Sequence, residues 1–149
     1  MYKEIVEVKI HALDMVFLPQ TQTDGAAGYD LKCNLHDEYM DLEPNKVQLI
    51  DTGIRLQIPK GFHAKICNRS SMGKKGIIIP NSPGIIDSDY RGYIKVLLLN
   101  LSDQTIRIHK HERIAQLLIE QNQPIIWSLS DVLDETERGS GGFGSTGEK

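Results

Sequence analysis

Hydrophobic and polar residues alternate with a period of two along most of this chain. Residues 54–58 set Ile54, Leu56 and Ile58 against polar neighbours, and residues 62–66 repeat the pattern. A period of two is typical of half-buried β-strands. Further strands are predicted at residues 4–10, 46–51, 76–79, 92–101, 105–109, 113–120 and 124–128. The chain is therefore expected to be all-β.

Turn-forming residues separate these short strands, as at residues 44–45 and 59–61. Many short strands at close intervals predict a β-sandwich or barrel. A helix is expected at residues 70–75, where Ser70 can cap the first turn, and a helical turn at residues 131–137.

One strand has an unusual pattern, because residues 94–99 are apolar on both faces apart from Lys95. A strand of this kind is covered on both sides. The second cover is expected to come either from the core or from another subunit.

The length bounds the domain organisation. A chain of 149 residues with 40% hydrophobic content can bury one core, so a single domain over residues 1–149 is predicted. Apolar residues become sparse after Ser128, which predicts a body over residues 1–128 and an arm over residues 129–149.

Composition excludes several classes of protein. A net charge of −3 is not the footprint of a protein that binds DNA or RNA. No apolar run approaches the roughly 18–20 residues of a membrane span, and the charged, alternating N-terminus is no signal peptide. Cys33 and Cys67 are too few for a disulfide framework. An intracellular protein with reduced thiols, cytoplasmic or nuclear, is expected.

Two polar clusters interrupt the first half of the pattern. Residues 27–31 are expected to form a turn that presents Asp30, either as a functional carboxylate or as one that bonds to its own backbone. Arg69, Ser70 and Ser71 combine a guanidinium with two hydroxyl groups at a turn or helix start. They can form either a phosphate cradle or an ordinary solvated turn.

Two more clusters follow. Asp87 and Asp89 point the same way if their segment is extended, whereas a bend would part them. Asp87 follows two isoleucines, so it is expected at the rim of a pocket, where desolvation can tune a general base, while Tyr90 offers a flat face to a sugar or base. A hairpin with a polar tip is the alternative. Gln116, with Arg113 before it, flanks a hydrophobic strand and is a weaker candidate.

The C-terminal arm is rich in glycine. Residues 139–149 hold five of the thirteen glycines around one aromatic, Phe143, and Arg138 precedes them. Glycines let backbone N–H groups approach phosphate, Arg offers a bidentate fork, and an isolated Phe can stack on a base. A disordered tail has the same composition.

Three other residues are assigned no role in the chemistry. His109 and His111 share a strand face, but no third metal ligand lies near them in the sequence. Trp127 is expected to pack rather than to bind a ligand.

With all five clusters in order, the chain resembles the homotrimeric dUTPase family along essentially its whole length. The five motifs are residues 27–31, 69–73, 84–92, 112–119 and 138–146. The resemblance implies a jelly-roll-type β-barrel in a homotrimer, with each active site at a subunit boundary and the arm donated by a third subunit. It further implies Mg²⁺-assisted hydrolysis of dUTP to dUMP and pyrophosphate, which keeps uracil out of DNA and supplies dUMP for thymidylate synthesis.

The resemblance also implies a role for each matching residue. Asp87 is the general base that activates the attacking water, and Asp30 holds waters of a Mg²⁺ ion bound to the triphosphate. The phosphate-binding residues implied are Arg69, Ser70, Ser71 and Gln116, with Arg138, Ser145 and Thr146 on the γ-phosphate. The residues implied for uracil and deoxyribose are Asn81, Gly84, Ile86 and Tyr90, with Phe143 stacked over the uracil as a lid.

The chain departs from the usual family pattern at Tyr93, Asn68 and residues 72–75, none of which removes a proposed catalytic group. Three alternatives remain. A dCTP deaminase shares the fold but requires a deaminating Glu and lacks this arm, and a catalytically idle trimeric scaffold or nucleotide sensor would be expected to lose Asp87 or the arm. A lectin-like or capsid-like module would leave the five clusters unexplained.

Overall fold

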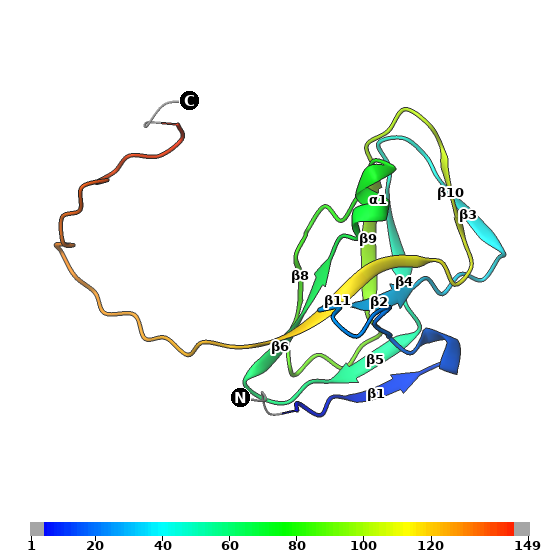
Figure 1. Cartoon of the computed structure of the whole chain (residues 1–149), viewed down its shortest axis with the longest axis horizontal. Coiled ribbons are helices and arrows are strands. Elements are labelled where there is room, and N and C mark those ends of the chain that lie inside the picture. Colours follow the sequence, from blue (N-terminus) through cyan, green and yellow to red (C-terminus); the bar gives the residue numbers. More distant parts are fainter. Residues whose placement is uncertain (1–4, 145–149) are drawn as a thin grey trace.

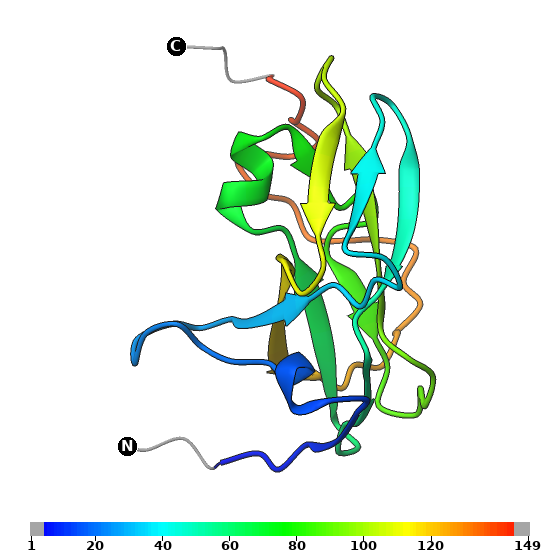
Figure 2. The same ribbon diagram turned by 90° about the vertical axis from the view of Figure 1, so that its right-hand side faces the viewer.

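The structure of the chain is a computed structural model that describes residues 5–144 (Figures 1 and 2). Two sheets have two strands each: β1 (Lys9–Ala12) pairs with β5 (Ile54–Gln57), and β3 (Tyr39–Leu42) pairs with β10 (Ile106–His109). A four-stranded sheet has the order β2 (Tyr29–Lys32), β11 (Arg113–Gln121), β6 (Phe62–Cys67), β8 (Gly84–Ile86). A three-stranded sheet has the order β4 (Val47–Asp51), β9 (Lys95–Asn100), β7 (Ile77–Ile78). All pairs are antiparallel and none joins consecutive strands. The all-β, jelly-roll-type prediction is confirmed.

The period of two arises from burial on one face of each strand. In β5, Ile54 and Leu56 are buried and Arg55 and Gln57 are exposed, as the alternation predicts. The inward side chains of the sheets form one hydrophobic cluster. Most predicted strands are present. β4, β7, β9 and β10 are shorter than predicted, whereas β6 and β11 each extend one residue further, because a strand ends where its partner does.

Several predictions of secondary structure are wrong. The first strand is β1 at Lys9–Ala12 rather than residues 4–10, because its register follows β5. Residues 124–128 are not a strand, since β11 ends at Gln121 and the described chain beyond it pairs with nothing. Residues 131–137 are not helical. β3 was not predicted, because it is short and lacks strong alternation. β8 was indicated only by the two isoleucines before Asp87.

The predicted helix is present as α1 (Ser70–Lys74), but it is not capped by Ser70. Arg69 occupies the N-cap position without a side-chain hydrogen bond, and Ser70 is the first helical residue. Met72 is 1% exposed and anchors the helix in the core. A 3-10 helix, Met15–Phe17, is capped instead by Asp14, which accepts a hydrogen bond from the Val16 N–H at 2.9 Å.

The strand expected to be covered on both faces is only partly covered within one chain. In β9, Val96 and Leu98 are buried in the core, whereas Leu97 and Leu99 on the opposite face are half-buried. Directly across on β4 are two exposed apolar side chains, Leu49 beside Leu97 and Val47 beside Leu99. We call these four residues the β4–β9 patch.

We expect Leu98→Ala to lower the free energy of unfolding by about 2–5 kcal/mol, because Leu98 is fully buried and its loss leaves a cavity. Urea denaturation at a fixed protein concentration measures this. Leu13→Ala removes the same atoms from a side chain that is 54% exposed and should cost less than about 1 kcal/mol. Equal losses in the two variants would contradict the assignment of Leu98 to the core.

The arm leaves the body directly after β11. The last contact with the body is at Asn122, whose N–H donates to the Gly61 carbonyl at 2.8 Å and whose Oδ1 lies 2.6 Å from His63 Nδ1. Every later hydrogen bond in the described chain stays within the arm, which extends away from the sheets (Figure 1). Trp127 is 90% exposed, so the packing predicted for it does not occur within one chain. Residues 5–144 contain no helix that is long and apolar enough to cross a bilayer.

Candidate active site

Asp30 joins two of the predicted motifs through its carboxylate. Residues 29–32 form β2 rather than the predicted turn, because they pair with β11. Oδ1 of Asp30 lies 2.8 Å from Nε of Arg69, and Oδ2 lies 3.1 Å from Nη1 of Arg113. The Asp30 side chain is only 11% exposed, so this charge pairing is well shielded from water. One carboxylate therefore holds two guanidinium groups at the end of the sheet.

Gln116 belongs to the same group. It lies on β11 directly opposite Asp30 of β2 and Cys67 of β6. Its Nε2 donates to the Asn68 carbonyl at 2.9 Å, which leaves the second N–H of the amide for another acceptor. A Cβ on Gly28 would meet the Gln116 side chain, so glycine there makes room for the amide.

The hydroxyl groups of the second motif lie beside this cluster. Ser70 and Ser71 are exposed in the first turn of α1, immediately after Arg69. Arg69 is fixed further by a hydrogen bond from its Nη1 to the Arg113 carbonyl at 2.9 Å. We call this cluster the phosphate group; its members are Asp30, Arg69, Ser70, Ser71, Arg113 and Gln116.

Asn68 was not among the predicted site residues, and Arg113 was named only as a neighbour of Gln116 without a role. Arg113 is identified by its ion pair with Asp30, and the only signal in the sequence was its place three residues before Gln116. The Asn68 side chain donates to the Ile77 carbonyl at 3.1 Å and ties the start of α1 to β7. Its departure from the family pattern thus has a structural role.

Asp87 lies at the end of β8, far from the phosphate group. It is exposed, so the desolvation predicted for it does not occur in a single chain. The Tyr90 N–H donates to the Asp87 carbonyl at 3.2 Å, which makes residues 87–90 a turn rather than an extended segment. Asp87 and Asp89 line a cavity of about 410 Å³ together with His63 and Asn122.

The residues predicted for the nucleoside lie in the same segment, residues 81–93, which we call the β8 loop. The predicted hairpin does not form there, because β8 pairs with β6 and not with a second strand of the segment. Gly84 is buried, Ile86 half-buried, and Asn81 and Tyr90 exposed. A Cβ on Gly84 would lie 3.4 Å from the Asn81 amide nitrogen. The Tyr90 hydroxyl donates to the Tyr93 carbonyl at 3.1 Å, and a side chain at Gly92 would collide with the Tyr90 ring. These contacts fix the position of the Tyr90 ring within the β8 loop.

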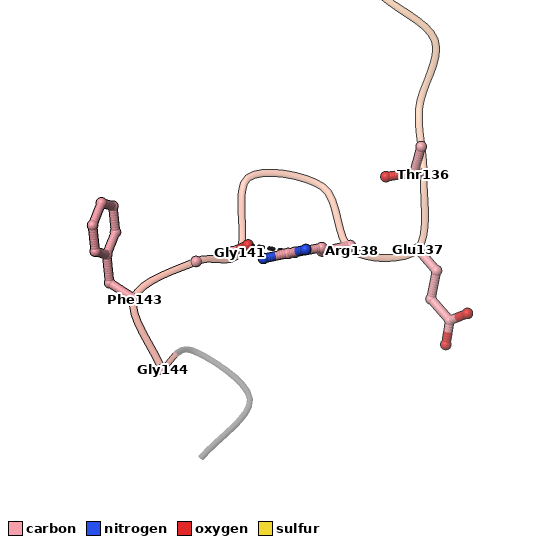
Figure 3. A pocket seen from close by; sticks show the side chains of 7 residues that line it. Thr136, Glu137, Arg138, Gly141, Phe143 and Gly144 are labelled. Atoms are coloured by element: carbon pink, nitrogen blue, oxygen red, sulfur yellow. Dashed lines mark hydrogen bonds between the residues drawn. The ribbon is translucent and has the colours of Figure 1, made fainter. Parts of the chain in front are cut away.

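The arm holds the remaining predicted residues. Nε of Arg138 donates to the Gly141 carbonyl at 2.8 Å, and the Gly139 N–H donates to Thr136, so residues 136–141 form a tight curl. Phe143 is exposed and points away from this curl (Figure 3). The cavity of about 870 Å³ at this point is lined by arm residues alone. Ser145 and Thr146 lie outside the described residues.

These three groups do not meet within one chain. Asp30 on β2 and Asp87 beyond β8 are three strands apart, and the pairing sets Asp30 level with Cys67 of β6 but Asp87 near His63. With about 4.8 Å between strands and 3.3 Å per residue along them, the two carboxylates are roughly 15–20 Å apart. The proposed base is therefore beyond reach of a phosphate held by the phosphate group of the same chain.

Neither cysteine adds chemistry of its own. Both thiols are free, as predicted. Burial raises the pKa of the Cys33 thiol to about 11, so this side chain stays protonated and unreactive. Among residues 5–144 no group of three or more His, Cys, Asp or Glu side chains is arranged to hold a metal ion, and His109 and His111 accordingly have no third ligand.

Comparison with known proteins agrees with the five motifs. A family model described as dUTPase matches residues 14–147. The deoxyuridine 5'-triphosphate nucleotidohydrolase of Rickettsia bellii is 47% identical over 146 residues, which cover 96% of this chain and 97% of that protein. The protein of the same name from Leptospira interrogans is 51% identical over 132 residues, covering 87% and 90% of the two chains.

Solved structures agree as well. The Staphylococcus bacteriophage 80alpha dUTPase with dUPNHPP superposes with a TM-score of 0.80 at 26% identity, over 95% of this chain and 98% of that one. The dUTPase of Streptococcus mutans gives a TM-score of 0.72 at 29% identity, over 80% and 98%. With the motifs in order and the all-β fold in common, these matches show that the chain belongs to the dUTPase family of nucleotide hydrolases.

Proposed function

We propose that this chain hydrolyses dUTP to dUMP and pyrophosphate in a homotrimer, at sites to which three copies each contribute one group of residues. This proposal is carried by one observation: within one chain, the phosphate group, Asp87 in the β8 loop and the arm lie apart from one another. Each group alone is chemically incomplete. The shared name of the curated relatives supports dUTP as the substrate.

The β4–β9 patch supports assembly of several copies. Val47 is 52% and Leu49 58% exposed, and Leu101 nearby is 56% exposed. Contiguous apolar surface of this kind is typical of protein interfaces. We propose that the β4–β9 patch packs around a threefold axis and supplies the missing cover of β9. We further propose that residues 1–149 form one domain, as body and arm, in an intracellular protein.

In the assembled site, the phosphate group would hold the triphosphate. The guanidinium groups of Arg69 and Arg113 keep free N–H donors beyond those bound to Asp30, and Gln116 keeps one amide donor. Ser70 and Ser71 add exposed hydroxyl donors. These donors would neutralise the charge that builds on the bridging oxygen as it leaves.

Asp87 of a second copy would act as the general base. It would accept a proton from a water that attacks the α-phosphorus in line, so that the water oxygen stays on dUMP and the bond to the α–β bridging oxygen breaks. Pyrophosphate leaves with that bond's electron pair. Arg138, Ser145 and Thr146 of a third copy would bind the γ-phosphate, and Phe143 would cover the base and exclude water.

The residues of the phosphate group fit a Mg²⁺ ion that arrives with the substrate. Each Asp30 oxygen contacts one guanidinium, and a carboxylate oxygen has two lone pairs, so one on each remains for a metal-bound water. Mg²⁺ commonly keeps several waters and binds through one or two carboxylates and phosphates. When bound, the ion would supply further neutralisation of phosphate charge.

Specificity is proposed to reside in the β8 loop, residues 81–93. Its backbone and the Asn81 amide can match the donors and acceptors of uracil, whereas cytosine would leave buried polar atoms unpaired at a cost of roughly 2–7 kcal/mol. The Tyr90 ring, fixed by its bond to Tyr93, would pack against deoxyribose and exclude a 2′-hydroxyl.

The test is pyrophosphate release in the presence of Mg²⁺ from dUTP, compared with dCTP, TTP and UTP. We expect cleavage of dUTP and little of the others, with activity lost when EDTA removes the metal. Deamination of dCTP, or cleavage of no nucleotide, would refute the proposal. Analytical ultracentrifugation should show a trimer, and a monomer with full activity would refute the shared site.

We expect Asp30→Asn to raise KM for dUTP about tenfold or more, because Arg69 and Arg113 lose the charge that orients them. The matched control is Asp41→Asn, which breaks the ion pair with Arg107 on an exposed sheet edge and should leave KM unchanged. Steady-state kinetics on both variants check this. Equal kinetic effects of the two changes would contradict a specific role for Asp30.

A further inference from the structure

A second cluster of basic side chains lies apart from the phosphate group, next to residues 81–93. A cleft of about 250 Å³ is lined by Lys9 and His11 on β1, Arg55 on β5 and Arg91 in the β8 loop (β1 and β5 are labelled in Figure 1). We call these four residues the basic cleft. His11 is directly opposite Arg55 in the β1–β5 register, so the two lie close together on one face.

The charges of the basic cleft are not neutralised by the chain that carries them. Within residues 5–144, Lys9, Arg55 and Arg91 have no carboxylate within ion-pair distance, whereas Arg69, Arg107 and Arg113 all do. Arg55 lies over the Tyr93 ring at 5.1 Å, and Arg91 donates to the Ser88 carbonyl at 2.7 Å. Their positions are thus fixed while their charge faces solvent. Clustered like charges repel, so an anionic partner would relieve a cost of folding.

The arm carries a matching anionic segment. Residues 131–137 contain four carboxylates, at Asp131, Asp134, Glu135 and Glu137, and no Lys or Arg. The described structure pairs none of these carboxylates with a cation, and the whole segment is exposed. An acidic arm segment and an unneutralised basic cleft therefore occur in the same chain.

Position along the chain links the two surfaces. The acidic segment directly precedes Arg138, and Arg91 of the basic cleft directly follows Tyr90. If the acidic segment were bound at the basic cleft, the Gly-rich residues that follow it would begin close to the β8 loop. Phe143 lies six positions after Glu137, a reach of at most about 20 Å.

We propose that residues 131–137 of one copy dock in the basic cleft of another copy, and that this docking guides the arm to the active site before nucleotide binds. The inference rests on the proposed donation of the arm between copies. It assigns the attraction to charge, so it should weaken as salt rises.

Hydrogen exchange of residues 131–137, followed by mass spectrometry on the ligand-free full chain, tests the docking. We expect these amides to exchange several-fold more slowly than in a peptide of the same sequence, and the protection to fall between about 0.05 and 0.5 M salt. In the Lys9→Glu/Arg55→Glu chain the protection factor of these amides should fall about three- to tenfold, which is the effect of losing a few exposed ion pairs. The matched control, Lys46→Glu/Lys110→Glu, makes the same charge change in two turns outside the cleft and should retain it.

Mixed assemblies test whether docking joins different copies. The Lys9→Glu/Arg55→Glu chain and an Asp134→Lys/Glu135→Lys chain should each be unprotected alone. Assemblies formed from both should recover protection of the unaltered residues 131–137, since that segment then meets the unaltered basic cleft of another copy. Docking within one chain would give no recovery and would refute the proposal. So would wild-type exchange as fast as in the free peptide. Hydrolysis of dUTP by that same wild-type sample would show that only the docking, and not the proposed function, had failed.

Discussion

Asp87→Asn is expected to lower kcat for dUTP by about 10²–10⁴-fold while the protein still binds the nucleotide. The physical reason is that Asn has nearly the same shape but cannot accept a proton from the attacking water. Since Asp87 is exposed at the end of β8, the change should leave the unfolding free energy of the chain nearly unaltered. Pre-steady-state kinetics would show that the chemical step, and not substrate binding, is slowed.

Asp89→Asn is the matched control for this variant. Asp89 lies two residues further along the same turn, is equally exposed and lines the same cavity. Because Asp89 is not the assigned base, loss of its charge should act only through the local electrostatic field and change kcat by less than about tenfold. Undiminished hydrolysis by Asp87→Asn, or equal losses in both variants, would refute the assignment of the base.

Deleting residues 138–149 is expected to leave a folded assembly of unchanged size with activity lowered by about 10²-fold or more. In the described structure the arm makes no hydrogen bond to the body after Asn122, so its removal should not destabilise the sheets. The loss would arise because the site stays open to water and the γ-phosphate loses its clamp. Circular dichroism and sedimentation check the fold, and pyrophosphate release checks the activity.

A mixing experiment extends this deletion to the shared site. The truncated chain has Asp87 but no arm end, and the full-length Asp87→Asn chain has the arm but no base. If the arm of one copy closes over the β8 loop of another copy, assemblies that contain both chains should regain activity that neither chain has alone. Absence of recovery in verified mixed assemblies would mean that the arm closes over its own chain. Full activity of the truncated chain alone would overturn the role of the lid.

The sequence predicted most of the strands because burial on one face imposes a period of two, as in residues 54–57. It failed where pairing rather than pattern decides. Residues 29–32 resemble a turn but form β2 because β11 lies beside them. Residues 124–128 are apolar enough for a strand, yet no strand is beside them in the described chain.

The candidate site shows the same division. Asp30, Arg69 and Gln116 were each identified from their motifs, but their mutual contacts and the part played by Arg113 required the structure. Asp87 was identified from its motif as well. It lines a cavity, as predicted, but the predicted desolvation does not occur because Asp87 is exposed in a single chain.

By itself, the sequence determined the all-β class, the five motifs and the family, because alternation and motif order are local properties of the chain. Only the tertiary structure decided which motifs meet. It joined Asp30 to Arg69 and Arg113, placed β11 and β6 between Asp30 and the strand that ends before Asp87, and left the arm, the β4–β9 patch and the basic cleft without partners in one chain. The reason is that register and strand order arise from contacts between residues far apart in sequence, which no local pattern encodes.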